Sequence, residues 1–248
     1  GTTGEPSTMT TAEKRSVIAF AVQQAAGRAV VIAGSGGNNT AQAVEDSLAA
    51  QELGADALLV VTPYYNKTTP KGLLAHYGAI AEAVDLPIIV YNVPGRTGLN
   101  VSPATMAELA TLPHVAAVKE ASGNIHQILE VRRLCPTLDL YSGSDEINLP
   151  ILAAGGCGVI SVASNIIPAD VARLVDCYLA GNTAEALALQ LKINPLVTAL
   201  FCETSPIPVK TAMNRMGLAA GDLRLPLVAM EPANERKLES ALAAYGLI

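Results

Sequence analysis

The 248-residue chain has no tryptophan, only two phenylalanines and few charged side chains, which make up 15% of it. Its four cysteines and three histidines stand singly, with no CxxC pair and no metal-ligand spacing, so we expect structural thiols and no bound metal. No basic run occurs and the net charge is −6, so a nucleic-acid partner is not expected. Apolar runs of transmembrane length and a leader-like start are also lacking, which predicts a cytoplasmic chain without a membrane partner.

Apolar residues are abundant, at half of the total, and they stand in short continuous runs. Such runs are typical of parallel strands that are covered on both faces. Six runs predict strands, at residues 29–34, 57–62, 87–92, 115–120, 138–142 and 158–161. Helices are predicted between and around them, at residues 11–26, 40–51, 71–84, 102–111, 124–134 and 145–154. Four more helices are predicted after the last strand, at residues 169–180, 183–201, 209–216 and 234–244.

This alternation predicts an α/β fold related to the (β/α)8 or TIM barrel, whose usual size is about 250 residues. A complete barrel needs eight strands, and the four final helices leave no room for two more. We therefore expect a barrel truncated to six recognisable strands, with a C-terminal helical region. The expected division is an incomplete β/α barrel over residues 1–165, then the last barrel helix and the C-terminal helices over residues 166–248.

Lys119 is the residue that points most directly to chemistry. It lies near the end of the apolar run 115–120, and Tyr91 lies near the end of the similar run 87–92. Burial disfavours the charged form of a lysine, and a neutral amine is a nucleophile for carbonyl groups. A nearby tyrosine could move the protons that imine chemistry requires. The alternative, a lysine whose amine reaches the surface from a strand end, is equally compatible with these residues alone.

Other polar residues follow the predicted strands, at residues 62–66, 92–98 and 142–145. Barrel enzymes place their chemistry at this end of the strands. Residues 34–39 read Gly-Ser-Gly-Gly-Asn-Asn between a strand and a helix, so a dinucleotide loop must be considered. Asn39 stands where the third glycine of that fingerprint belongs, and no Walker lysine follows, which argues against a nucleotide.

Taken together, these segments resemble the dihydrodipicolinate synthase family, within the pyruvate-dependent class I aldolase superfamily that also contains N-acetylneuraminate lyase. The matching segments run in the family's order from residue 1 to residue 227: GTTGE, GSGGNNT, VTPYYNK, YNVPGRTG, KEASGN, SGSD, GVISV, PIPVK and LRLPL. The resemblance implies that Lys119 forms a Schiff base with pyruvate and that Tyr91 relays protons to the imine and carbinolamine. It implies that Thr2 and Thr3 hold the pyruvate carboxylate, with one of them joining the relay. No cofactor is implied beyond the lysine imine.

The resemblance also implies roles on neighbouring loops. Tyr65 would reach across a dimer interface to complete the relay of the next subunit, and Arg96 would receive the carboxylate of aspartate semialdehyde. Backbone at Gly143 and Ile160 would line the pocket. Tyr65 as a packing aromatic and Arg96 as a surface arginine remain alternatives. Asp145 is expected simply to cap the helix after Gly143.

The sequence departs from the family in two places. The strand, helix and strand that normally precede GTTGE are missing, which leaves Thr2 and Thr3 without their strand. We expect another copy of the chain to cover the resulting gap in a homodimer or larger homo-oligomer. Second, family members inhibited by lysine bind it at a dimer interface, where Gln42 here replaces an acidic residue and Lys14 adds a positive charge. Both changes oppose binding of a cation.

The function predicted from this resemblance is the condensation of pyruvate with aspartate semialdehyde in lysine and diaminopimelate biosynthesis. A retro-aldol lyase acting on a sugar acid or another 2-oxo acid is the alternative within the superfamily. A catalytically impaired paralogue that acts in assembly is the alternative outside enzymes. The missing strands favour the last alternative, and the presence of Lys119, Tyr91, Tyr65 and Arg96 opposes it.

Overall fold

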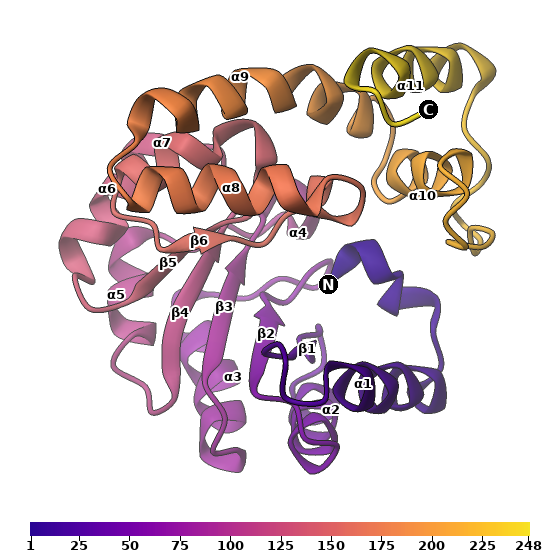
Figure 1. Cartoon of the computed structure of the whole chain (residues 1–248). Coiled ribbons are helices and arrows are strands. Elements are labelled where there is room, and N and C mark those ends of the chain that lie inside the picture. Colours follow the sequence, from indigo (N-terminus) through magenta and orange to yellow (C-terminus); the bar gives the residue numbers. More distant parts are fainter. The chain divides into compact units, whose positions relative to one another are not determined.

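The computed structural model of the chain describes residues 1–248 and contains six strands and eleven α-helices (Figure 1). The chain divides into two compact units. The first unit holds residues 1–8, 143–152 and 158–248, and the second unit holds residues 9–142 and 153–157. The expected boundary at residue 165, between an incomplete barrel and a C-terminal helical region, stays a prediction.

The second unit is built on five parallel strands, and each pairs with the next one along the chain. Their bounds are Ile32–Gly34 (β1), Ala57–Val61 (β2), Ile88–Asn92 (β3), Val115–Glu120 (β4) and Asp139–Ser142 (β5). The middle strands are buried on both faces, which explains their continuous apolar sequence. The register places Val61, Tyr91, Lys119 and Tyr141 side by side. The carboxyl ends of four strands therefore meet at one edge.

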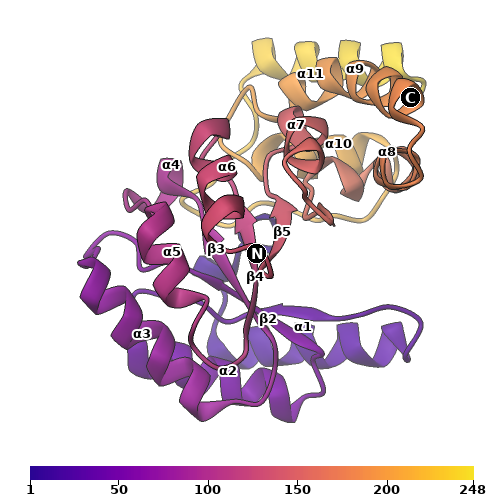
Figure 2. The ribbon, with the colours of Figure 1, turned by 90° about the vertical axis from the view of Figure 1, so that its left-hand side faces the viewer.

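Six helices lie before and between these strands. Their bounds are Thr11–Ala25 (α1), Thr40–Glu52 (α2), Pro70–Ala83 (α3), Pro94–Thr97 (α4), Pro103–Leu109 (α5) and Ile125–Leu134 (α6). Helices α2, α3, α5 and α6 contact one another in that order, and Figure 2 shows α3, α5 and α6 in a row along one face of the strands. The side chains of Asn39, Ser102 and Asn124 cap the N-termini of α2, α5 and α6.

The first unit is mainly helical. Its elements are the 3-10 turns Thr2–Gly4 (η1), Pro6–Thr8 (η2), Asp145–Ile147 (η3) and Ala163–Asn165 (η4), the strand Gly158–Val159 (β6), and the helices Asn148–Ala153 (α7), Pro168–Leu179 (α8), Thr183–Leu200 (α9), Ile207–Arg215 (α10) and Pro232–Tyr245 (α11). Helix α9 packs against α8, α10 and α11 around one apolar core. Asp170 on α8 holds both Lys192 on α9 and the Tyr245 hydroxyl on α11, which ties the three helices together.

The order of the predicted elements is confirmed, as is the type of all but one, and most boundaries agree within two residues. Strand β1 begins three residues later than expected, and Val30 before it is 71% exposed. The predicted helix 145–154 is a 3-10 turn followed by α7. No helix is both long and apolar enough to cross a membrane.

Candidate active site

Lys119 and Tyr91 lie together at the carboxyl edge of the second unit's sheet. They are register partners near the ends of β4 and β3, and the Lys119 amine is 4.2 Å from the centre of the Tyr91 ring. Lys119 is 8% exposed and Tyr91 is 6% exposed. The apolar run around Lys119 therefore holds a buried amine against a phenol, rather than one that extends into solvent. Imine formation needs a buried amine with a proton-donating side chain in its neighbourhood, and tyrosine is a side chain of that kind.

The next residue on each strand belongs to a different group of contacts. Asn92 and Glu120 are also register partners, and both are fully buried. The Asn92 amide donates to both Glu120 carboxylate oxygens at 3.2 Å, and the Ser122 N–H donates to Oε1 at 2.8 Å. Burial raises the pKa of Glu120, and the hydrogen bonds that the carboxylate accepts from Ser122, Asn92 and Gln127 act in the opposite direction.

This polar group extends into the loop after β3 and onto α6. The Asn92 amide also donates to Asn100, whose own amide donates to Gln127 at 2.7 Å. The Asn92 oxygen accepts the Val101 N–H at 3.1 Å. Sequence inspection did not find this network, because its members come from four segments that only the fold brings together. In the sequence, only the polar residues Asn92 and Glu120, directly after Tyr91 and Lys119, indicate such a network.

Arg96 lies on α4, the single turn that begins two residues after β3. The turn ends at Gly98, whose φ of 67° is the left-handed conformation that glycine adopts without strain. Thr97 is buried and its hydroxyl donates to the Val93 and Leu99 carbonyls, which fixes the turn. Arg96 itself is exposed, so a rigid turn presents a cation on the loop that follows Tyr91.

Tyr65 lies on the loop after β2 and is not packed in its own copy of the chain. Its side chain is 91% exposed, in contrast to the buried Tyr91 and Lys119. Tyr65 and Lys67 both have left-handed backbone, with φ of 67° and 52°. Non-glycine residues rarely adopt this conformation, and where they do it is often at functional sites.

The other predicted site residues belong to the first unit. Thr2 and Thr3 form the turn η1, and the Glu5 N–H closes it on the Thr2 carbonyl at 3.0 Å. The Glu5 carboxylate holds the Lys210 ammonium at 2.7 Å and accepts the Arg224 N–H at 3.0 Å. Burial acts to raise the pKa of Glu5, but these contacts outweigh it and lower the pKa. The threonine turn is thus tied to α10 and the loop after it.

Gly143 precedes η3, and Ile160 directly follows β6. Asp145 does not cap the helix after Gly143 as expected: Ser144 is the N-cap residue of η3, which has no side-chain cap. The Asp145 carboxylate instead accepts the N–H groups of Val162 and Ala163, both at 2.9 Å. It therefore fixes the segment after Ile160, a contact that local sequence could not reveal.

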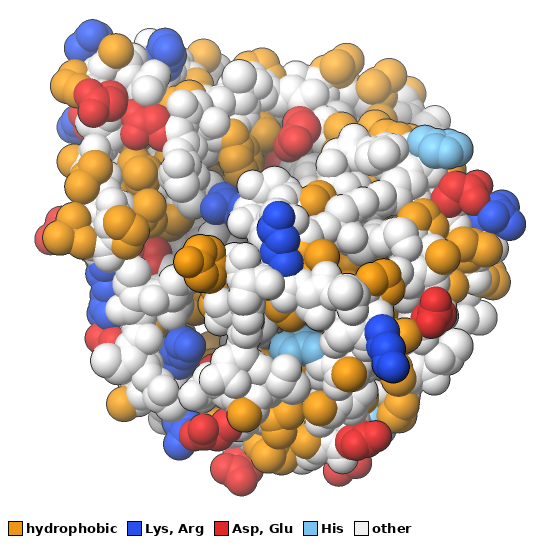
Figure 3. All heavy atoms as spheres, turned by 180° about the vertical axis from the view of Figure 1, so that it is seen from behind, with side chains coloured by type: hydrophobic (Ala, Val, Ile, Leu, Met, Phe, Trp, Pro, Cys, Tyr) orange, Lys and Arg blue, Asp and Glu red, His pale blue; other side chains and the backbone are white.

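No cluster of three or more His, Cys, Asp or Glu side chains lies close enough to hold a metal ion. On the face that Figure 3 shows, lysine and arginine side chains lie singly or beside acidic ones, and no broad basic patch forms.

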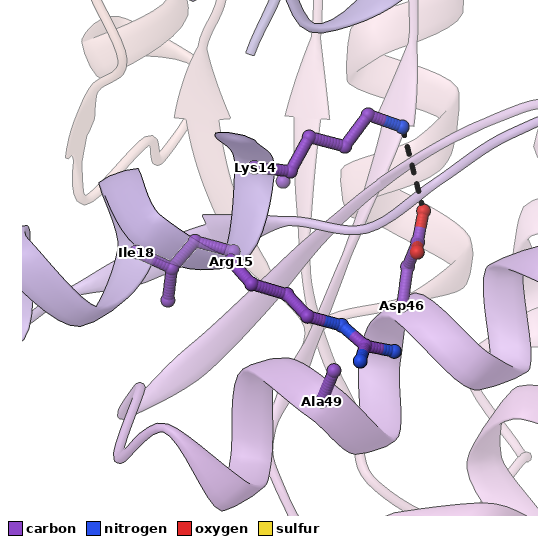
Figure 4. A pocket seen from close by; sticks show the side chains of 6 residues that line it. Lys14, Arg15, Ile18, Asp46 and Ala49 are labelled. Atoms are coloured by element: carbon purple, nitrogen blue, oxygen red, sulfur yellow. Dashed lines mark ion pairs between the residues drawn. The ribbon is translucent and has the colours of Figure 1, made fainter. Parts of the chain in front are cut away.

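A small pocket lies between α1 and α2 of the second unit (Figure 4). The Lys14 ammonium is 3.6 Å from one Asp46 carboxylate oxygen, and the Gln42 amide donates to the other at 3.0 Å. Arg15 pairs with Glu45 at 2.9 Å. The residues around the pocket are Lys14, Arg15, Ile18, Gly34, Asp46 and Ala49. Its one acidic lining group is thus already engaged by two donors.

The whole chain matches known proteins of one family. Residues 1–245 match the family described as the dihydrodipicolinate synthetase family, and the chain belongs to it. A 4-hydroxy-tetrahydrodipicolinate synthase of Caldicellulosiruptor bescii is 57% identical, over 100% of this chain and 84% of that protein. The chain is an enzyme, a lyase of the 4-hydroxy-tetrahydrodipicolinate synthase type.

Solved structures agree with this assignment. The crystal structure of dihydrodipicolinate synthase from Aquifex aeolicus has a TM-score of 0.97 at 45% identity, and covers 100% of this chain and 85% of that one. The chloride-inhibited enzyme from Acinetobacter baumannii, complexed with pyruvate, has a TM-score of 0.96 at 43% identity, with 100% and 86% covered. The α/β fold with its parallel sheet is therefore of the TIM-barrel type found in these enzymes.

Proposed function

We propose that this chain condenses pyruvate with aspartate semialdehyde through an imine on Lys119. The observation that carries the proposal is the buried contact between the Lys119 amine and the Tyr91 ring, 4.2 Å apart at the ends of paired strands. The 57% identical relative has the name of an enzyme of this reaction, and the Acinetobacter structure is described as complexed with pyruvate.

In this proposal the neutral Lys119 amine adds to the ketone carbon of pyruvate, and the carbinolamine loses water to give the imine. Tyr91 supplies and removes the protons of these steps. Loss of a methyl proton from the protonated imine then gives a neutral enamine, whose carbon adds to the aldehyde of the second substrate. The positively charged nitrogen of the protonated imine takes up the electron pair that the proton leaves behind, which is why a covalent lysine lowers the barrier to this step.

Carboxylate binding is assigned to other residues. Thr2 and Thr3 hold the pyruvate carboxylate, because hydroxyls and turn N–H groups can cradle an anion. Arg96 receives the carboxylate of aspartate semialdehyde, since a guanidinium offers two parallel donors. Backbone at Gly143 and Ile160 lines the pocket.

Tyr65 completes the proton relay of a neighbouring subunit, so the working form is a homodimer or larger homo-oligomer. Its 91% exposure supports this role, because the side chain is available to another copy. All four cysteines are free, which suits the reducing cytoplasm as the proposed location.

The test is to incubate the protein with pyruvate and borohydride and to locate the added mass by peptide mapping. We expect one adduct, on Lys119, because reduction makes the imine permanent. Lys119→Arg should abolish it, since a guanidinium stays protonated and is a poor nucleophile. The control is Lys71→Arg, an exposed position on α3, which should trap pyruvate normally. An adduct on another lysine, or none on the unaltered protein, would refute the proposal.

A further inference from the structure

The buried network behind the active lysine does not touch any proposed substrate position. Successive strand residues point to opposite faces, so Asn92 and Glu120 face away from Tyr91 and Lys119. They nevertheless pair with each other one step beyond the Tyr91–Lys119 pair, in the same register. The two strands are therefore linked by a side-chain contact at the level where the chemistry is proposed.

We infer that Glu120, together with Asn92, is a positioning residue that holds Lys119 and Tyr91 in reactive alignment through the ends of β4 and β3. This inference rests on the proposed function of Lys119. Four hydrogen bonds define the clamp. Asn92 donates to both Glu120 oxygens at 3.2 Å, the Ser122 N–H donates to Glu120 at 2.8 Å, and the Ala121 N–H donates to the Asn92 carbonyl at 2.9 Å.

The position of the clamp gives it this effect. The hydrogen-bonded pairing of β3 and β4 ends at Asn92 and Glu120, and both strands end at these residues. Strand ends are held by fewer backbone bonds than strand centres and fray more readily. Lys119 and Tyr91 are the last residues before this end, so their separation depends on what closes it. A misplacement of about 1 Å between reacting groups can cost on the order of 100-fold in rate.

Stability alone does not account for a carboxylate at this place. Glu120 has no exposed surface, and its hydrogen-bond partners Asn92, Ser122 and Gln127 include no cation. Burying such a group costs free energy, and apolar residues of similar volume usually stabilise a core at least as well. The bidentate contact instead fixes one geometry between two strand ends, which an apolar pair does not do.

The test measures the rate of imine formation separately from folding. Glu120→Gln keeps the size of the side chain but turns one acceptor into a donor that faces the Asn92 amide. We expect the folded variant to form the borohydride-trapped pyruvate adduct at least about 10-fold more slowly at saturating pyruvate. Combining Glu120→Gln with Asn92→Asp exchanges the amide and the carboxylate, restores a donor–acceptor pair, and should recover much of the lost rate.

The control is Ser47→Ala, which removes a buried hydroxyl of α2 that bonds Ser35 and the Ala43 carbonyl. It should lower the melting temperature without slowing adduct formation. If Glu120→Gln does not fold, Asn92→Ser removes the bridge while leaving Glu120 its Ser122 bond, and should slow the reaction likewise. A folded clamp variant that traps pyruvate at the wild-type rate overturns the inference. Absence of trapping in the unaltered protein instead defeats the proposed function itself.

Discussion

Adjacent residues on one strand have different tasks in this chain. Lys119 and Glu120 are both buried, yet they face opposite sides of β4 and have different partners. The alternation of side chains along a strand separates the proposed nucleophile from the group that aligns it. A substitution at Lys119 therefore removes the proposed nucleophile itself. A substitution at Glu120 leaves the amine in place and changes how it is aligned with Tyr91.

His76 provides a second test at the scale of single residues, one that concerns pH. It is 4% exposed on α3, its Nδ1 lies 2.9 Å from the Thr40 hydroxyl, and its Nε2 is buried without a hydrogen-bond partner. Burial lowers the pKa of His76 below its ordinary value, so the folded state binds this proton less tightly than the unfolded state.

Stability contributed by neutral His76 is therefore present above about pH 6.5 and is lost as the pH falls from there toward the lowered pKa. We expect the free energy of unfolding, measured by urea titration, to decline by up to about 1.4 kcal/mol per pH unit from this group. His76→Asn can keep the bond to Thr40 and should flatten the decline in that range. An equal slope in both proteins would show that other groups cause it.

At the scale of elements, the sequence predicted strands better than short turns. Continuous apolar runs identified β2, β3 and β4 almost to the residue, because burial on both faces leaves little freedom of composition. The single turn α4 escaped prediction, since four residues carry no helical period. Strand β1 was predicted too long because an apolar sequence does not reveal where pairing begins.

The same limit applies to the candidate site. Lys119 and Tyr91 were found from strand-end position and motif, and their contact follows from register. The Glu120 clamp and the Glu5–Lys210 ion pair were not found. In the second case 205 residues separate the partners, and no local pattern reports a contact at that distance in the chain. Side-chain partners of this kind depend on tertiary packing.

Helices α1 and α2 carry a prediction about regulation. Lysine should bind poorly at the interface where inhibited family members hold it. Lys14 and Gln42 both contact the Asp46 carboxylate. The resemblance implies that the inhibited family members have an acidic residue where this chain has Gln42. The ammonium group of lysine would therefore meet no unpaired carboxylate among Lys14, Gln42 and Asp46. Calorimetry should detect no lysine binding in the micromolar range. Gln42→Glu restores an acid and should tighten binding, and a micromolar dissociation constant for the unaltered protein would contradict the prediction.

At the scale of the whole molecule, the exposed Tyr65 connects activity with assembly. A side chain that is 91% exposed on a left-handed loop gains little from its own subunit. If it serves the site of a neighbouring copy, no single chain contains a complete relay. Activity should then depend on protein concentration in the range where oligomers dissociate, since the missing hydroxyl comes from the partner.

Mixed oligomers test this directly. Tyr65→Phe lacks the hydroxyl but keeps Lys119, and Lys119→Arg lacks the nucleophile but keeps Tyr65. Each variant alone should have little activity. After the two are unfolded together and refolded, a mixed dimer contains one site that joins an intact Lys119 to an intact Tyr65 from the other chain. We expect condensation activity well above the sum of the two separate variants, approaching about a quarter of the wild-type value if subunits pair at random and each complete site acts alone.

The control is the same mixture of separately refolded proteins, assayed before subunits exchange, which should show no gain. If Tyr65 acts within its own chain, no pairing restores a complete site and the mixture stays at the sum of its parts.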